Sequence, residues 1–224
     1  MSTPSSAPHL ASIDDTVKQL AEHYAFRLVA RDVVAGRKAL VIDIAPRDQQ
    51  RFPHRLWLDM ASGLPLRQQL LSEQGHAVDT VQIVRLDSLT RFNDTLAVQD
   101  VQAEAFAHTL WRAYWLPEGF YRQPADVDVT LNAVNVQRQV YGDGLATFSV
   151  FTGPVSEGVA LREGVHQLGN FRAAARHIRH DGKPWQVIAV GAIPAEVLSR
   201  VVSQVRWDGD AAKSEETERS ASRD

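Results

Sequence analysis

Carboxylates are the first residues to test for chemistry, because two of them at the right separation can act as general acid and base. The chain offers an adjacent pair, Asp14 and Asp15, and a spread trio, Asp43, Asp48 and Asp59. The adjacent pair stands at the start of a predicted helix, where such residues cap the first turn. The trio lies among predicted strands, whose solvent faces normally carry charge, so we favour structural roles over a catalytic carboxylate pair.

The other chemistry-bearing residue types lack the spacing that catalysis or metal binding needs. His177 and His180 are three residues apart, and on a predicted strand they would point to opposite faces. Ser149 has no G-x-S-x-G setting, and Gly142-Asp-Gly144 is typical of a hairpin turn because no helix and basic residue follow it. Cysteine is absent, which excludes disulfides, thiol nucleophiles and Cys-ligated metals. We therefore expect no enzyme activity, no cofactor and no metal site.

Composition places the chain among ordinary soluble globular proteins, with 44% apolar and 23% charged residues. The formal net charge of -3 gives no reason to expect a nucleic-acid partner. No apolar run approaches the roughly 18–20 residues of a membrane span. The start, MSTPSSAP, has neither the basic nor the apolar region of a secretory signal. Taken alone, the residues predict a cytoplasmic protein or a trimmed mature product.

The elements that position these residues are mainly short strands. In the first half, apolar residues at helical spacing predict a helix over Asp14–Tyr24. Strands joined by glycine-containing turns then predict an antiparallel meander. On the third strand, Leu56, Leu58 and Met60 are expected to form the apolar face and Trp57 the opposite one. The predicted strands are Phe26–Val33, Arg37–Ala45, Arg55–Met60, Leu64–Ser72 and Ala77–Leu86.

The second half repeats the strand pattern and ends in a helix. Asp143-Gly144 and Asp181-Gly182 are strong hairpin signals, and Pro117 with Gly119 predicts a turn between aromatic residues. An apolar stripe after Pro194 predicts the final helix, with Val197, Val201, Val202 and Val205 on its buried face. The predicted strands are Val134–Tyr141, Leu145–Phe151, Val165–His180 (bulged or broken) and Pro184–Gly191.

These patterns predict two folded domains with disordered ends. The loss of strand pattern after residue 86 places the boundary within Leu96–Leu110, a stretch that is either mildly helical or a connector. The predicted segments are a disordered start at 1–12, a first domain at 13–90, a linker at 91–110, a second domain at 111–207 and a disordered tail at 208–224.

Arginine and tryptophan supply the candidate binding residues, because both are enriched at interaction hot spots. For Trp57, core packing and partner contact are equally favoured alternatives. For the basic strand Arg172–His180, a solvated edge is favoured over an anion site, since cationic residues discourage edge-to-edge pairing. The candidate partner-binding residues are Arg47, Arg51, Arg55, Trp57, Trp115, Phe120, Arg172 and Arg176.

The order of short motifs resembles the MucB/RseB family over roughly residues 10–207. In the first domain the motifs are Val34-Ala-Gly-Arg37, Val41-Ile42, Pro46-Arg-Asp-Gln49, His54-Arg-Leu-Trp-Leu-Asp59, Ser62-Gly-Leu-Pro-Leu66 and Leu70-Leu-Ser-Glu-Gln-Gly75. In the second they are Trp115-Leu-Pro-Glu-Gly-Phe120, Tyr141-Gly-Asp-Gly-Leu145, Phe148-Ser-Val-Phe151 and Val187-Ile-Ala-Val-Gly-Ala-Ile-Pro194.

This resemblance implies an α+β fold that is mostly antiparallel β. Part of a curved sheet like that of LolA and LolB would precede a small β-sheet domain with a C-terminal helix. The resemblance also implies a periplasmic negative regulator of the sigma-E type envelope stress response. Such a protein binds the periplasmic segment of an anti-sigma factor (RseA or MucA) and shields it from the initiating protease, and lipopolysaccharide or lipoprotein acyl chains release it.

The family's large domain and signal peptide begin before this chain does, so an open sheet edge and an exposed apolar face are expected. A fragment, a misassigned start and a product that depends on homodimer formation stay open as explanations. A lipid or lipoprotein carrier of the periplasm is the alternative function, resting on fold analogy. A third hypothesis, a hydrolase using Asp and His, has no nucleophile–base spacing to support it.

Overall fold

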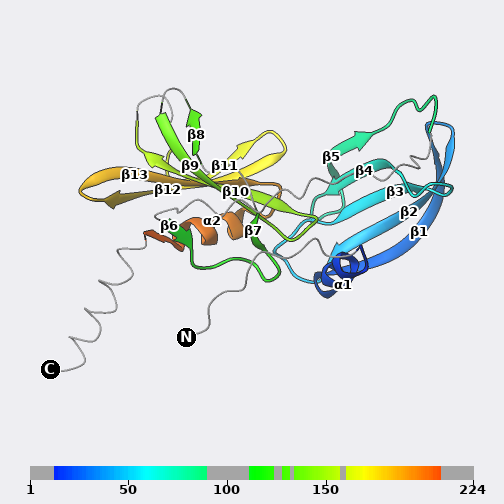
Figure 1. Ribbon diagram of the computed structural model, residues 1–224, viewed down its shortest axis with the longest axis horizontal. Helices are drawn as coiled ribbons and strands as arrows, with labels where there is room; N and C mark the ends of the chain where they lie inside the picture. The colour runs from blue at the N-terminus through cyan, green and yellow to red at the C-terminus, as the bar shows by residue number, and fades with distance from the viewer. Residues whose placement is uncertain (1–12, 90–110, 124–127, 132–133, 157–159, 208–224) are drawn as a thin grey trace, which may run out of the picture. The chain divides into compact units, whose positions relative to one another are not determined.

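The computed structural model describes residues 13–89, 111–123, 128–131, 134–156 and 160–207 (Figure 1). The chain divides into two compact units, residues 1–102 and 103–224. In the described residues, each unit consists mainly of antiparallel strands with one helix, which confirms the predicted α+β class. The expected disordered ends and the whole of the expected linker at 91–110, which includes Leu96–Leu110, lie outside the described residues.

The first unit is one helix followed by a five-stranded meander in the order β1-β2-β3-β4-β5. Its predicted helix and five strands are confirmed, with bounds that differ by at most four residues. The elements are α1 (Ile13–His23), β1 (Tyr24–Val34), β2 (Arg37–Pro46), β3 (His54–Asp59), β4 (Pro65–Leu71) and β5 (Ala77–Gln82).

Ala35 and Gly36 form the tight turn that joins β1 to β2. Both residues have positive φ, 49° and 75°, and the flanking Val34 and Arg37 are paired. Two positive φ angles in a two-residue loop define a type I′ turn, whose twist matches that of the strands. This turn sets the register of the β1–β2 hairpin. Farther from the turn, a bulge between Leu28 and Ala30 shifts that register.

One face of this sheet is buried, and it is not the face that the sequence pattern predicts. Val34, Ala39, Val41, Trp57 and Leu66 form the core cluster of the unit. The prediction that Leu56, Leu58 and Met60 lie inward is wrong: Met60 is 49% exposed and the two leucines are only half-buried. Trp57 and Asp59 are buried instead, because the polar groups of that face pair with one another.

The opposite face of the five-stranded sheet carries apolar side chains that are exposed along β1 and half-buried on β2 and β3. Strand register places Leu28 of β1 beside Ile42 of β2, and Ile42 beside Leu56 of β3. At the β1 edge, Phe26, Leu28 and Val33 are 46%, 61% and 63% exposed. This surface, called the open apolar face below, comprises Phe26, Leu28, Val33, Leu40, Ile42, Leu56 and Leu58.

The second unit contains a seven-stranded sheet in the order β11-β12-β13-β10-β9-β7, with β8 also paired to β9, and a two-stranded sheet of β14 and β6. Its elements are β6 (Trp111–Ala113), β7 (Tyr121–Gln123), β8 (Asp128–Leu131), β9 (Val134–Gly142), β10 (Thr147–Pro154), β11 (Gly164–Leu168), β12 (Phe171–His180), β13 (Lys183–Gly191), α2 (Ala195–Ser203) and β14 (Val205–Trp207).

Helix α2 covers one face of the seven-stranded sheet (Figure 1). Val197, Val201 and Val202 are buried, as predicted, and so is Leu198, which the prediction did not include. Val205 is not part of the helix, which ends at Ser203; Val205 instead begins β14 and pairs with Ala113. The apolar spacing continued across this boundary, so periodicity alone could not separate helix from strand.

The basic stretch predicted as one bulged or broken strand is two strands joined by a turn at Gly169, whose φ is 61°. In β12, Arg172–Ala175 are paired with both β11 and β13, whereas residues 176–180 pair, among the described strands, with β13 alone. The expected solvated edge is therefore confined to the second half. Asp181 and Gly182 make another type I′ turn, with φ of 49° and 73°, which confirms the predicted hairpin.

The two faces of the large sheet differ along β13. Val187 and Ala189 face α2 and are fully buried. Gln186, Ile188 and Val190 alternate with them and face the other side, where they line a pocket with residues of β9 and β10. A run that is apolar on both faces is typical of a strand covered on both sides.

Candidate functional site

In the first unit, arginines and aspartates pair across neighbouring strands. Asp43 on β2 accepts hydrogen bonds from Arg55 on β3 at 2.5 and 3.1 Å, and from Arg27 on β1 at 3.3 Å. The hydrogen bonds from Arg55 are the main reason that the pKa of Asp43 lies below its usual value. Arg55, a candidate binding residue, is thus tied into the sheet.

Asp59, at the end of β3, forms a second charge pair with Arg37. Its carboxylate receives two hydrogen bonds from Arg37, at 3.0 and 2.7 Å, and two from Ser62, from the amide at 2.9 Å and the hydroxyl at 2.6 Å. Arg37 first and Ser62 second hold the pKa of Asp59 well below its usual range. Asp43, Asp48 and Asp59 each pair with a different arginine, which gives each of them a structural role.

We expect Asp59→Asn to remove an acid-dependent part of the stability of the first unit. A carboxylate with a lowered folded-state pKa stabilises the fold above its unfolded pKa of about 4 and loses that contribution as the pH falls further. Melting temperatures should therefore differ most between wild type and variant above about pH 4, and the difference should shrink toward pH 2. A difference that stays constant over this range would contradict the assignment.

Trp57 lies inside the first unit. The side chain is 6% exposed, its indole nitrogen donates to Asp32 at 2.9 Å, and the guanidinium of Arg67 lies 4.4 Å from its ring centre. The hydrogen bond to Asp32 satisfies the indole N–H, which is the usual requirement for a buried tryptophan. Core packing is thus the alternative that the structure supports for Trp57.

Arg47 and Arg51 connect the helix and a loop to the sheet. Arg47 is exposed, and its side chain donates to the carbonyl of Ala21 in α1 at 3.2 Å. The side chain of Arg51 is fully buried, forms an ion pair with Asp48 and lies 5.6 Å from the ring centre of Tyr24. A residue buried in this way cannot contact a partner directly, so the expectation for Arg51 is corrected.

In the second unit, arginine and aromatic side chains from distant parts of the sequence lie together at the C-terminal end of α2. Arg200 of α2 lies 3.9 Å above the ring of Trp115. The carbonyl of Ser203 accepts a hydrogen bond from Arg176 of β12 at 2.8 Å, and the next carbonyl, of Gln204, accepts one from the amide of Tyr114 at 3.0 Å. Cationic side chains here also suit the negative end of the helix dipole.

Two more arginines extend this cluster over the two-stranded sheet. Arg112 and Arg206 are directly opposite each other in the β6–β14 pair. Their guanidinium groups lie 5.8 and 5.7 Å from the ring of Tyr114, which is 47% exposed. We call the whole set the arginine–aromatic surface: Arg112, Tyr114, Trp115, Arg176, Arg200 and Arg206.

Phe120 and Arg172 lie elsewhere in the second unit. Phe120 is 7% exposed and its ring centre lies 5.4 Å from that of Phe148, so it is a core residue and not a direct contact. Arg172 is half-buried, and its Nη1 has no hydrogen-bond partner among the described residues. Arg172 and Arg176 share the α2 face of β12.

Comparison with known families gives two matches in tandem along the chain. Residues 2–106 match the MucB/RseB N-terminal domain, and residues 105–206 match the MucB/RseB C-terminal domain. Together the two matches cover nearly all of the sequence. In the sequence, the boundary between them lies close to the boundary between the two compact units, which is at residues 102 and 103. The chain belongs to the MucB/RseB family.

Individual relatives and solved structures agree with this membership. The sigma factor AlgU regulatory protein MucB of Pseudomonas aeruginosa is 34% identical over 210 residues, which are 87% of this chain and 64% of that protein. The sigma-E factor regulatory protein RseB of Escherichia coli K12 is 26% identical, covering 90% of this chain and 64% of RseB. The chain thus spans about two thirds of the length of these relatives.

Two solved structures share the fold, and both contain a second polypeptide. The complex of Pseudomonas aeruginosa MucA and MucB matches with a TM-score of 0.69 at 34% identity, covering 85% of this chain and 67% of that one. MucB in complex with MucA(peri) matches with a TM-score of 0.68 at the same identity, covering 84% and 69%.

In this MucB/RseB chain, the structure separates the candidate residues by burial. Arg51, Trp57 and Phe120 are buried, while Arg47, Arg55 and Arg172 remain at least partly accessible. Trp115 and Arg176 come together at α2. Sequence reasoning missed Tyr114, Arg200 and Arg206, of which only Arg200 lies in an element that it predicted, the final helix. Their arginine and aromatic types were the available signal.

Sequence reasoning also missed the pocket beside β13, although the unbroken apolar run Val187–Ile193 indicated a strand buried on both faces. The described residues hold no cluster of three or more His, Asp or Glu that could bind a metal ion. None of the helices in the described ranges is long and apolar enough to cross a membrane.

Proposed function

We propose that this MucB/RseB chain is a periplasmic negative regulator of sigma-E type envelope stress signalling. It binds the periplasmic segment of an anti-sigma factor of the MucA or RseA type and protects that segment from regulated proteolysis, without catalysis of its own. The observation that carries the proposal is the tandem family match, together with similarity to MucB structures that contain MucA.

In the second unit, we propose the arginine–aromatic surface as the site that contacts the anti-sigma factor segment. Arginine and aromatic side chains dominate binding energy at protein interfaces. Arg200 is exposed and lies 3.9 Å above the ring of Trp115, and Tyr114 beside them is 47% exposed. This accessible combination of arginine and aromatic groups favours contact with a polypeptide segment of the partner.

Binding of the MucA periplasmic segment to the full chain tests both proposals. We expect saturable binding by isothermal titration calorimetry, and slower cleavage of the segment by its initiating protease when the chain is present. The double variant Arg200→Glu with Arg206→Glu should weaken binding at least about tenfold, because hot-spot arginines contribute about 2 kcal/mol or more.

Arg179→Glu is the matched control for this experiment. Arg179 is exposed on the same unit but points from the opposite face of β12, beside Pro184 in the strand register. This substitution makes the same kind of charge change and should leave affinity nearly unchanged. Failure of the wild-type chain to bind would contradict the regulatory function. Equal affinity in the double variant and the control would reject only the arginine–aromatic surface.

A second candidate function is binding of lipid or lipoprotein acyl chains in the periplasm. The open apolar face of the five-stranded sheet favours it, because contiguous apolar surface on a soluble protein usually marks an interaction site. The same face and the β1 edge would also be covered in a homodimer, which analytical ultracentrifugation would detect.

Delipidated chain should then take up a fluorescent acyl-chain probe, and Leu28→Asp should abolish uptake. Leu28 is 61% exposed on the edge strand β1, so the substitution is expected to have little effect on folding. Met60→Asp, at a residue 49% exposed beyond the end of β3, serves as the control. No uptake by wild type, or equal uptake by Leu28→Asp, would reject the lipid hypothesis at this face.

A further inference from the structure

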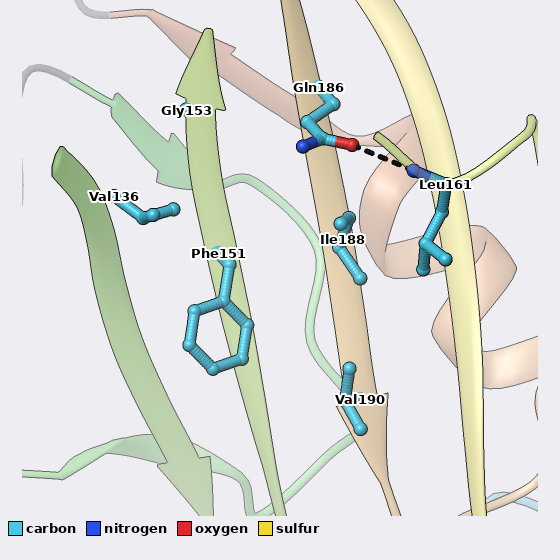
Figure 2. A pocket seen from close by; sticks show the side chains of 7 residues that line it. All are labelled: Val136, Phe151, Gly153, Leu161, Gln186, Ile188 and Val190. Atoms are coloured by element: carbon cyan, nitrogen blue, oxygen red, sulfur yellow. Dashed lines mark hydrogen bonds between the residues drawn. The ribbon is translucent and has the colours of Figure 1, made fainter. Parts of the chain in front are cut away.

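A pocket lies on the face of the seven-stranded sheet that is turned away from α2. Figure 2 shows it between β9, β10 and β13, with Leu161 crossing over one side. Its lining is almost entirely apolar: Val136, Phe151, Gly153, Leu161, Gln186, Ile188 and Val190. The arginine–aromatic surface belongs to the α2 side of this unit, so the pocket is a separate site.

The pocket owes its shape to one cross-strand pair. Gly153 of β10 is directly opposite Gln186 of β13, and the missing side chain of Gly153 leaves space beside the glutamine. Gln186 accepts a hydrogen bond from the Leu161 amide at 3.2 Å, and His177 donates to the Leu161 carbonyl at 2.8 Å. These two bonds hold the Leu161 backbone across the sheet, so the pocket is formed before any ligand binds.

Gln186 also presents an unused hydrogen-bond donor. The residue is only 4% exposed, its carbonyl oxygen is bound to Leu161, and its amide nitrogen meets no acceptor among the described residues. Figure 2 shows this nitrogen on the side of β10, next to Gly153. A donor at the edge of an apolar pocket favours a ligand that brings a carbonyl oxygen to accept its hydrogen bond.

The volume of the pocket limits the size of the group that can bind in it. Its volume of about 210 Å³ is below the roughly 300–1,000 Å³ of pockets that enclose whole small molecules. It suits one large side chain. At the rim, the guanidinium of Arg138 lies 6.0 Å from the ring of Phe151, and its Nε donates to Ser149 at 3.4 Å. The positive charge of Arg138 favours an acidic residue next to the inserted group.

We propose that this pocket anchors one large aliphatic or aromatic side chain of an extended polypeptide, whose main-chain carbonyl accepts a hydrogen bond from Gln186. An acidic residue near the anchor pairs with Arg138. The inference goes beyond the regulatory function, since it holds for any polypeptide with this pattern and does not require an anti-sigma factor.

Methyl and side-chain amide NMR of the full chain tests the proposal without knowledge of the partner. The probes are the N-acetyl methylamides of leucine and phenylalanine, with the alanine compound as the small-side-chain control. We expect saturable shifts of the Ile188 and Val190 methyls and of the Gln186 amide with both large probes, at affinities on the order of 1 mM. The alanine compound should leave these signals in place.

Two variants make the result decisive. Ile188→Trp fills the pocket and should abolish the shifts, whereas Val165→Trp adds the same bulk at a residue 53% exposed outside the pocket and should preserve them. No saturable shift with either large probe, or equal binding by Ile188→Trp, would overturn the proposal. Shifts caused by decanoate but not by the capped amino acids would overturn it in favour of a hydrocarbon ligand.

Discussion

Replacement of Trp57 by alanine is expected to unfold the five-stranded sheet. Trp57 is the largest member of the core cluster of the first unit, and no other tryptophan occurs in residues 1–102. Removing a buried aromatic side chain typically costs about 3–5 kcal/mol, which is a large share of the roughly 5–15 kcal/mol that stabilises a domain. The substitution also leaves Asp32 without its indole donor.

Hydrogen exchange read by mass spectrometry localises this effect. Peptides from β1–β5 should lose protection in Trp57→Ala, while those from β9–β13 keep it. Trp57→Phe is the control: it retains most of the apolar contact and loses only the hydrogen bond to Asp32, so its loss of stability should be smaller. Full protection in Trp57→Ala, combined with weaker partner binding, would instead mean that Trp57 acts at an interface.

Phe148→Ala is expected to have a comparable effect on the second unit. Phe148 is 2% exposed, and its ring centre lies 5.3 Å from that of Tyr141 and 5.4 Å from that of Phe120. Aromatic pairs at these separations contribute beyond simple burial. We expect a loss of about 3–5 kcal/mol in the free energy of unfolding, measured by denaturant titration of the tryptophan fluorescence from this unit.

Phe171 offers a matched control for that measurement. It belongs to the same unit and is 51% exposed at the start of β12. Surface substitutions usually change stability by less than about 0.5 kcal/mol, so Phe171→Ala should unfold close to the wild type. Similar losses for both variants would show that the aromatic cluster around Phe148 is not the centre of this core.

Most strands of this protein could be predicted because their signals are local. The pairs Ala35-Gly36 and Asp181-Gly182 supply the positive φ angles of type I′ turns, so the hairpins could be located from two adjacent residues. The buried face of α2 followed from apolar spacing within nine residues. By contrast, the short strand β14 was missed, because it has no pattern of its own and exists only through pairing with β6.

The inward face of the first sheet could not be predicted from apolar spacing. Leu56 and Leu58 satisfied the expected alternation, yet Trp57 and Asp59 are the more buried residues of β3. Asp59 is buried because Arg37, which is 22 positions away, neutralises its charge, and Trp57 because Asp32 accepts its N–H. Such compensation between distant residues decides which polar groups can leave water.

The amino-acid sequence by itself determined the strand-rich α+β class, most element positions and membership of the MucB/RseB family, because each depends on neighbouring residues or on motif order. Only the tertiary structure decided which candidate residues are accessible and which groups meet. Trp115 and Arg176 are 61 positions apart in the sequence, and both contact the end of α2. Gly153 and Gln186 form a pocket only because β10 and β13 pair in one particular register. Pairing between residues that are distant in the sequence depends on the whole fold, so the local propensity of each residue does not predict it.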